Sequence, residues 1–382
     1  MRPMDLELNE QEKKIREAIG SFADKEIAPH AARIDRTGEY PTDNMAKLGK
    51  LGYMGIMVPA EYGGAGLNSM AYAIVIEEIS RRCASTGALV SVHNSFAPML
   101  LLKYGTEEQK RKYLPPLARG EVYGGFAGTE PEAGSDLGSM RSTAILQGDH
   151  YIVNGTKTFI TGGPVAGTVI IFAKTDPTAG ARGISAFIVE SSFKGYKVGR
   201  VLEKMGINGS HTSELVFEDM AVPKENLLGK LGDGFKMALA TIDGGRVGIA
   251  AQAVGLAQAA LDEAVKYSKT RVQFGAPIAN LQAIQWEIAE MATKVEASRL
   301  LTYRAAFLKD SGARFGKDVA MAKLFASETA VFCANRSLQI HGGYGYMKDH
   351  PIERIYRDAK ITEIYEGTSE VQKLVISSAL LR

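Results

Sequence analysis

Apolar residues recur at helical spacing through the first third of the chain. Ile15, Ile19, Phe22 and Ile27 lie three to five positions apart, which is the period of an amphipathic helix. Pro29 is expected to end this helix, because proline cannot donate the next backbone hydrogen bond. Three further helices are predicted over residues 71–82, 95–104 and 106–118, the last interrupted by Pro115 and Pro116.

The pattern changes near residue 122. From there to about residue 222 the apolar runs are short, rich in β-branched residues and bounded by glycine and proline, which is typical of strands. Asn154-Gly155 separates two such runs, and this dipeptide is the strongest short signal for a hairpin turn. Further strands are predicted over residues 169–173, 184–189 and 214–217, so this part forms a β domain.

Helical spacing returns after Gly234 and persists. Ile284, Ile288, Met291 and Val295 mark one long helix. A second runs from Val319 to Ile340 and is expected to end at the glycines that follow. The order helical, β, helical predicts an α+β chain of several domains, whose last section can form a helical bundle.

Composition places the chain among soluble globular proteins. Of its 382 residues, 45% are apolar and 23% are charged. The net charge of +2 favours neither a nucleic-acid nor a membrane-surface partner. Cys83 and Cys333 are too few for a disulfide framework or a Cys-based zinc site. No apolar run approaches the roughly 20 residues of a membrane span.

Two cysteines without a nearby partner are best suited to a reducing cytoplasm. Residues 1–5 contain no apolar stretch of the kind found in secretory signals, and Asn9 with Glu12 already marks a helix start. Nucleotide-binding fingerprints of the Rossmann and P-loop types, a serine nucleophile elbow and a zincin histidine pair are absent from the sequence. We therefore expect no metal site.

The most informative candidate for chemistry is Glu366, between Tyr365 and Gly367. A helical pattern follows at once, with Ser369 and Gln372 at capping-box spacing. A carboxylate on a turn, backed by a rigid helix, suits a general base. The same residues could form an ordinary surface turn that starts a helix, and the motif alone leaves both interpretations open.

Two segments in and before the β domain could face a flat ligand. Residues 129–136 combine hydroxyls, small side chains and backbone amides, which can hydrogen-bond the edge of a polar ring, although a plain inter-domain turn has the same composition. Phe159 and Thr161 lie two positions apart on one predicted strand, so they share a face. We expect that face to meet a ligand.

Three segments in the last section have unusual composition. Arg271 ends a helix with a basic last turn, where it either complements the helix dipole or grips a phosphate. Residues 339–346 form a glycine-rich helix end that either caps the helix or admits a cofactor close to the backbone. Gly244 and Gly245 lie inside a helical pattern, where each costs about 1 kcal/mol relative to alanine, so close packing or a ligand is expected there.

These five segments, in this order, resemble the acyl-CoA dehydrogenase family of flavoproteins. The resemblance extends from the Asn9 helix to Ser378 and is specific in its ordered combination. It implies a homotetramer and a three-domain fold: an N-terminal helical domain (residues 1–121), a middle β-barrel-like domain (122–230) and a C-terminal four-helix bundle (231–382).

The resemblance also implies a role for each matched residue. Glu366 is similar to the catalytic base. The implied substrate contacts are Ser135, Asp243, Arg246 and Gly367. The implied contacts to FAD are Phe126, Gly128, Thr129, Ser135, Phe159, Thr161, Arg271, Phe274, Gln339, Gly343, Thr368 and Glu370. Among these, Arg271 and Phe274 resemble contacts to the FAD of a neighbouring subunit.

Two positions depart from the family pattern. Phe159 stands where many members have tryptophan, and Glu132 replaces a smaller residue. The substitution at Phe159 is expected to alter stacking on the flavin, while the effect of Glu132 is not determined by the sequence.

The implied reaction is FAD-dependent α,β-dehydrogenation of an acyl-CoA thioester to the trans-2-enoyl-CoA, with electrons passed to an electron-transfer flavoprotein. Glu366 would remove the α-proton while the β-hydrogen leaves as hydride to the flavin. Expulsion of water by substrate should raise the pKa of Glu366, whereas the N-terminus of the following helix should lower it. The sequence leaves open which effect is larger.

The implied substrate is a short acyl chain. Residues 83–95 resemble the short-chain, butyryl-type branch. Glutaryl-type members carry an arginine where this chain has Gly87, and Gly245 stands where isovaleryl-type members place their base, so the base assignment rests on Glu366. An acyl-CoA oxidase, a branched-chain dehydrogenase and a flavin-containing acyl-CoA binder without turnover are the alternatives.

Overall fold

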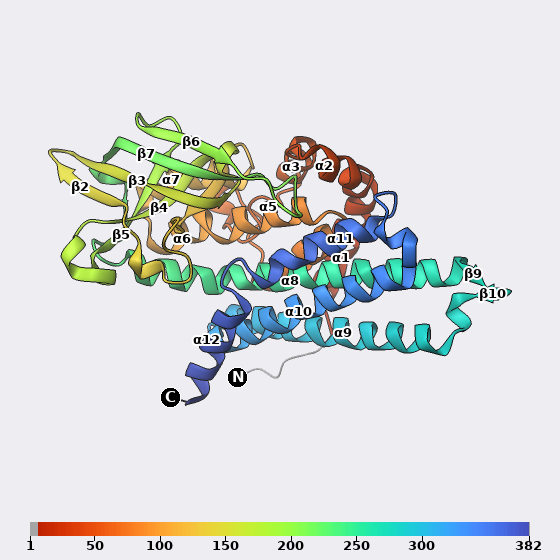
Figure 1. Cartoon of the computed structure of the whole chain (residues 1–382). Coiled ribbons are helices and arrows are strands. Elements are labelled where there is room, and N and C mark those ends of the chain that lie inside the picture. The colour runs from red at the N-terminus through yellow and green to blue at the C-terminus, as the bar shows by residue number, and fades with distance from the viewer. Residues whose placement is uncertain (1–6, 382) are drawn as a thin grey trace.

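The computed structural model describes residues 7–381. Helices of the amino-terminal part and an eight-stranded sheet lie on one side of three long helices from the carboxyl-terminal part (Figure 1). The signal-sequence interpretation of residues 1–5 falls outside the described residues. The domain boundaries expected near residues 121 and 230 fall in the connections between α7 and β1 and between β8 and α8, and they stay predictions.

The first helical segment ends at Ile27, just before Pro29, as expected, and a new helical turn follows directly. It begins with the capping box, in which Asn9 Oδ1 accepts from the Glu12 amide and Glu12 Oε2 accepts from the Asn9 amide. Pro29 lies at the start of a new helical turn, where its missing N–H costs no bond. The successive segments are α1 (Glu10–Phe22), a π-helical turn (Ala23–Ile27), a 3-10 turn (Ala28–His30) and α2 (Ala31–Thr37).

The remaining amino-terminal helices include two, over residues 42–50 and 84–95, that the periodicity did not indicate. They are α3 (Thr42–Lys50), α4 (Ser69–Arg82), α5 (Ala84–Ser95), α6 (Ala97–Tyr104) and α7 (Glu107–Ala118). All residues of α5 are buried, so it has no polar face and no amphipathic period. The helix expected from Ser95 begins instead at Ala97.

The interruption expected at Pro115 and Pro116 is wrong. Both prolines lie within α7, close to its end. The carbonyl of Pro115 accepts from the Arg119 amide (3.1 Å) and that of Pro116 from the Glu121 amide (3.0 Å), so the chain keeps its helical course to the last turn.

The middle part forms one sheet. Its strands are β1 (Tyr123–Ala127), β2 (Thr143–Gln147), β3 (His150–Thr161), β4 (Ala166–Lys174), β5 (Ile184–Glu190), β6 (Tyr196–Val201), β7 (Thr212–Pro223) and β8 (Leu227–Leu228). The strand order is β6-β7-β3-β2-β4-β5-β8, and β1 pairs in parallel with β4. β1 thus carries Phe126 into the sheet beside the amino-terminal helices.

The hairpin predicted at Asn154-Gly155 is wrong, because β3 runs straight through this dipeptide. The turn lies instead at residues 148–149, between Gln147 and its partner His150. At Gly155 (φ 149°) the register against β7 shifts, which is a β-bulge. A Cβ at Gly155 would lie 2.6 Å from Ser142 Cβ, so glycine is required there for close approach and not for a turn.

Three long helices dominate the carboxyl-terminal part. The helices are α8 (Gly234–Thr270), α9 (Gln282–Asp310), α10 (Gly316–His341), α11 (Pro351–Lys360) and α12 (Ser369–Leu381). A short hairpin of β9 (Val272–Gln273) and β10 (Ala276–Pro277) joins α8 to α9. α10 packs on α8, α9, α11 and α12, which makes it the centre of the bundle (Figure 1).

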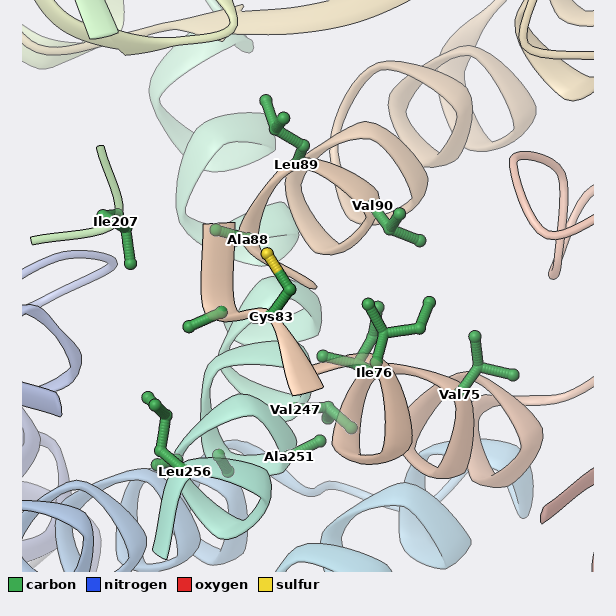
Figure 2. Close-up of a cluster of buried hydrophobic side chains, with 14 of the residues drawn as sticks. Val75, Ile76, Cys83, Ala88, Leu89, Val90, Ile207, Val247, Ala251 and Leu256 are labelled. Carbon is green, nitrogen blue, oxygen red and sulfur yellow. The ribbon is translucent and has the colours of Figure 1, made fainter. Parts of the chain in front are cut away.

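The core is continuous between the amino- and carboxyl-terminal helices. Val75 and Ile76 of α4 pack in one cluster with Leu89 of α5 and with Val247 and Ala251 of α8 (Figure 2), and all five are fully buried. Within residues 7–381, no helix combines the length and apolar character that crossing a bilayer requires.

Candidate functional site

Glu366 lies in a turn whose backbone is strained. Glu366 (φ 53°) and Gly367 (φ 92°) are both left-handed, and for a non-glycine residue this conformation costs of order 1–3 kcal/mol. Donors from three helices hold the turn. Lys323 Nζ on α10 and Gln372 Nε2 on α12 donate to the Gly367 carbonyl at 2.8 and 2.7 Å, and Arg246 Nε on α8 donates to the Glu366 carbonyl at 3.4 Å.

The capping box expected at Ser369 and Gln372 is wrong. α12 begins at Ser369, one residue earlier than that spacing requires. Thr368 therefore caps the helix, with its hydroxyl accepting from the Val371 amide at 3.3 Å. The Gln372 side chain is used for the Gly367 carbonyl instead.

The Glu366 carboxylate is poised to accept a proton. Both of its oxygens are buried and have no hydrogen-bond partner among residues 7–381. Burial raises the pKa of Glu366 to about 8, against the opposing charges of Lys323 and Arg246. Burial by the protein alone is thus a larger effect than the two cations together, while the effect expected from the N-terminus of α12 stays a prediction. A carboxylate with free lone pairs and a pKa near neutrality has the properties of a general base.

Gly245 makes room for this carboxylate. α8 continues unbroken through Gly244 and Gly245. A Cβ at Gly245 would overlap Glu366 Oε2 and would lie 3.1 Å from Phe96 Cζ. At Gly244 the nearest atom would be Lys309 Nζ at 3.5 Å, an ordinary contact. The close-packing requirement expected for this glycine pair is thus confined to Gly245 and comes from the Glu366 carboxylate.

The predicted substrate contacts Asp243, Arg246 and Gly367 gather around Glu366. Arg246 Nη1 and Asp243 Oδ1 form an ion pair at 2.6 Å in which the arginine side chain is buried. Burial lowers the pKa of Arg246 and raises that of Asp243, because each charge is taken out of water. Ser135 is exposed in the loop after β1.

Aromatic contacts connect the base to the sheet. Phe96, which would meet a side chain at Gly245, packs against Phe126 of β1 with a ring-centroid distance of 4.5 Å, and Phe126 packs against Phe172 at 5.1 Å. A Cβ at Gly128 would lie 2.9 Å from Phe126 Cε1, so glycine keeps this ring in place. The predicted residues Phe126 and Gly128 are thus brought beside the base.

Phe159 and Thr161 both face away from the core. Phe159 has a left-handed backbone (φ 57°) at a register shift of β3, and 67% of its surface is exposed. Thr161 is half-buried, whereas Thr158 and Ile160 between and beside them are buried. The carbonyl of Thr129 accepts from the Thr158 amide at 3.0 Å, which joins the two segments predicted to face a ligand.

A buried ion pair that sequence reasoning missed also joins these segments. Lys157 Nζ on β3 lies 2.8 Å from Glu130 Oε1 in the loop after β1, and the two side chains are 0% and 7% exposed. Although burial raises the pKa of Glu130, the charge of Lys157 and the Arg141 amide lower it overall, while burial lowers the pKa of Lys157. A lysine inside residues 156–161, whose other members are apolar or hydroxyl residues, was the available signal. Glu132, the second position that differs from the family pattern, forms an exposed ion pair with Arg141.

A cavity of about 390 Å³ lies at the far end of α8, and Arg271 and Gly343 both line it. The Arg271 guanidinium lies 5.2 Å from the ring centroid of Tyr344, and no atom would lie within 4 Å of a Cβ at Gly343. Phe274 is 95% exposed at the tip of the β9–β10 hairpin, and Gln339 is exposed near the end of α10. The open space at Gly343 shows that local packing does not require this glycine.

The predicted cofactor contacts therefore form two separate groups. α8 has 37 residues and is about 55 Å long at 1.5 Å per residue. Gly245 lies in its first third beside Glu366, and Arg271 follows its last residue, so about 40 Å separates them along the axis. Figure 1 shows β9 and β10 at the opposite end of α8 from the sheet. Thr368 and Glu370 lie with the first group, at the start of α12.

Models of three acyl-CoA dehydrogenase domains match the chain in sequence order. The N-terminal domain model matches residues 9–121, the middle domain model residues 125–220 and the C-terminal domain model residues 232–381. The chain belongs to the acyl-CoA dehydrogenase family. This membership confirms the family resemblance and the three-part fold of helical, sheet and helical domains predicted from the sequence.

Similar proteins cover almost the whole length of this acyl-CoA dehydrogenase family member. It is 51% identical to the short-chain specific acyl-CoA dehydrogenase of Clostridium acetobutylicum, over 99% of this chain and 100% of that protein. It is 50% identical to the acryloyl-CoA reductase (NADH) of Anaerotignum propionicum, over 100% of this chain and 97% of that protein. A chain in a solved structure on the electron transferring flavoprotein of Acidaminococcus fermentans is 48% identical, with a TM-score of 0.98 and 99% and 100% of the two chains covered.

Proposed function

We propose that this chain catalyses FAD-dependent α,β-dehydrogenation of a short-chain acyl-CoA thioester to the trans-2-enoyl-CoA. The observation that carries the proposal is the Glu366 carboxylate, which is buried, unpartnered among the described residues and raised in pKa to about 8. The ionised form of this carboxyl group, whose fraction grows as the pH approaches about 8, can remove a proton from a carbon acid, and only the glycine at position 245 leaves it room.

The residues around Glu366 can also stabilise the charge that develops as the α-proton leaves. The Glu366 amide donates no hydrogen bond within residues 7–381, so it is free to donate to a thioester carbonyl. FAD, when bound, would supply the hydride acceptor. Phe159, held outward by its left-handed backbone, would contact the flavin together with Thr161, Thr129 and Phe126. Closure of this site by substrate excludes water and strengthens these interactions.

The two groups of cofactor contacts support a homo-oligomer. Because about 40 Å of α8 separates them, one bound FAD uses the Glu366 group of one chain and the Arg271 group of another. We propose a homotetramer, in keeping with the family resemblance. The relative described with an electron transferring flavoprotein supports such a protein as the electron acceptor. The cytoplasmic location stays a prediction.

A short, uncharged acyl chain is supported by the packing of α5. A Cβ at Gly87 would lie 3.0 Å from Ser80 Cβ, so this position has no room for the arginine of glutaryl-type members. The 51% identity to a short-chain specific relative supports the same choice.

Anaerobic titration of the purified protein with acyl-CoAs of increasing length tests the proposal. We expect butyryl-CoA to bleach the flavin band and electron-transfer flavoprotein to reoxidise the enzyme. Rapid oxygen consumption with slow transfer to that flavoprotein would indicate an oxidase. Binding of butyryl-CoA without bleaching would contradict the proposal and indicate a binding protein. In the reverse direction, crotonyl-CoA should reoxidise flavin that a chemical reductant has bleached, with protonated Glu366 returning the α-proton, so the two rates show which direction is faster.

We expect Gly245→Ala to slow flavin reduction by butyryl-CoA by about 10²-fold while FAD content is unchanged. The added methyl group displaces the Glu366 carboxylate, and a displacement of about 1 Å is enough for such a loss. Gly244→Ala, one residue earlier on α8, is the matched control and should keep the rate within a factor of about three. Equal rates for the two variants in stopped-flow reduction would contradict this packing argument.

We expect Arg271→Ala to weaken FAD binding by roughly 10- to 100-fold. The arginine lines the cavity at Gly343, and a charge-assisted bond to a phosphate is worth about 1.5–3 kcal/mol. Lys269→Ala in the last turn of the same helix is the control, because it shares any helix-dipole effect without lining the cavity. FAD occupancy after dialysis distinguishes them, and an equal loss in both variants would favour the dipole interpretation.

A further inference from the structure

The hydrogen-bond donors around Glu366 avoid its carboxylate. Lys323, Gln372 and Arg246 all donate to backbone carbonyls of the Glu366–Gly367 turn. The carboxylate oxygens keep both sets of lone pairs free among residues 7–381. These donors therefore hold the strained turn without occupying the base.

Using a lysine at position 323 to hold this turn costs hydration free energy, because the side chain is buried. Its side chain is fully buried on α10, and within residues 7–381 it makes no ion pair with a carboxylate. A buried cation without a paired anion loses several kcal/mol of hydration. Gln372, a neutral amide, already donates to the same Gly367 carbonyl at 2.7 Å. Holding the turn therefore does not require a charge at position 323.

We propose that Lys323 is a positioning residue whose positive charge keeps the Glu366 carboxylate ionisable in its buried site. The proposal rests on the proposed function of Glu366 as the base. The other cation beside Glu366 is Arg246, which is paired with Asp243 at 2.6 Å. Arg246 therefore has its positive charge balanced by Asp243. Lys323 has no carboxylate partner among the described residues, so its positive charge acts on Glu366 without such a balance.

Charged and titratable groups reach this site from every helix packed on it. α8 provides Asp243 and Arg246, and α10 provides Lys323. Tyr72 on α4, Glu363 and Tyr365 before the turn, and Glu370 on α12 complete the set. Burial lowers the pKa of Lys323 to about 8, close to that of Glu366, so each group affects the ionisation of the other.

The pH dependence of flavin reduction by butyryl-CoA separates charge from simple support of the turn. In Lys323→Met we expect the apparent pKa of the base to rise by about one pH unit or more. The rate constant should fall roughly tenfold at pH 7 and recover most of this loss at about pH 10, where the base is ionised again. Lys323→Arg, which keeps the charge, should keep the wild-type rate at pH 7 and should not show the alkaline shift.

Gln372→Leu is the matched control, because it removes a neutral donor from the same carbonyl. Gln372→Leu should lower the rate of flavin reduction by the same factor at every pH, without shifting the apparent pKa. A Lys323→Met profile that is parallel to that of Gln372→Leu would overturn the proposal. If Lys323→Met does not fold, Lys323→Gln keeps a donor without the charge, and the same alkaline shift is expected.

Thermal unfolding tests the proposal without any reaction. Glu366→Gln should raise the melting temperature at about pH 9, and it should do so by more in the Lys323→Met background than in the wild type, because the carboxylate has lost its cation. Equal gains in the two backgrounds would count against the proposal. If no acyl-CoA reduces the wild-type flavin but the gains differ, the proposed function fails while the electrostatic role of Lys323 stands.

Discussion

Glu366→Gln is expected to lower flavin reduction by acyl-CoA by roughly 10²–10⁴-fold or more, while FAD and substrate still bind. Glutamine has nearly the shape of glutamate and fits the space left by Gly245, but it cannot accept the α-proton. Stopped-flow bleaching under anaerobic conditions measures the rate, and the FAD spectrum confirms that the cofactor is retained. An undiminished rate of flavin reduction in Glu366→Gln would contradict the assignment of Glu366 as the base.

The same substitution should stabilise the protein at alkaline pH. Burial raises the pKa of Glu366 from 4.5 to about 8, so the folded state binds this proton more tightly than the unfolded chain does. Its contribution to stability is full below about pH 4.5 and is lost as the pH rises through about 8. Glu366→Gln removes this loss, which corresponds to about 1.4 kcal/mol per unit of pKa shift and to a few kcal/mol in all.

Thermal unfolding of the two proteins across pH measures this gain. We expect melting temperatures that agree near pH 5 and differ by a few degrees at about pH 9. Glu203→Gln, at an exposed position, is the control and should show no such pH-dependent gain. A gain of equal size at pH 5 and pH 9 would show that the carboxylate is not destabilised by burial.

Lys157→Met is expected to destabilise the protein by about 3–5 kcal/mol and to release FAD. The substitution leaves Glu130 as a buried charge without its cation, and breaking such a pair costs more than the pair itself contributes. The loop that carries Gly128 and Thr129 then loses both Lys157 contacts, to the Gly128 carbonyl and to Glu130, and keeps the backbone bond from Thr158 to Thr129. Denaturant unfolding gives the stability, and flavin fluorescence after dialysis gives the cofactor content.

Two variants make this test specific. Lys197→Met breaks the ion pair with Glu218, in which both side chains are 60% exposed, and should change stability by no more than about 1 kcal/mol. Adding Glu130→Gln to Lys157→Met should restore part of the loss, because it removes the stranded charge and keeps an acceptor for the Ser142 amide. A loss for Lys157→Met as small as that for Lys197→Met would show that the pair does not support the site.

Local signals predicted much of the fold because they act within a few residues. The capping box at Asn9 and the helical periods of α9 and α10 were predicted correctly, because caps and amphipathic faces depend on residues only a few positions apart. The same kind of reasoning was wrong at Asn154-Gly155. There the close approach of Ser142, which directly precedes β2, requires glycine, and no short-range signal distinguishes such a bulge from a turn.

The sequence by itself determined the order of helical and β regions, the family, and Glu366 as the carboxylate to examine. Only the tertiary structure decided how that carboxylate behaves. Its pKa depends on burial by α8 and on charges from α10, which lie far from it in the chain. The Lys157–Glu130 pair and the separation of Arg271 from Glu366 were likewise decided in three dimensions. Burial and charge act through space, and a sequence records neighbours along the chain alone.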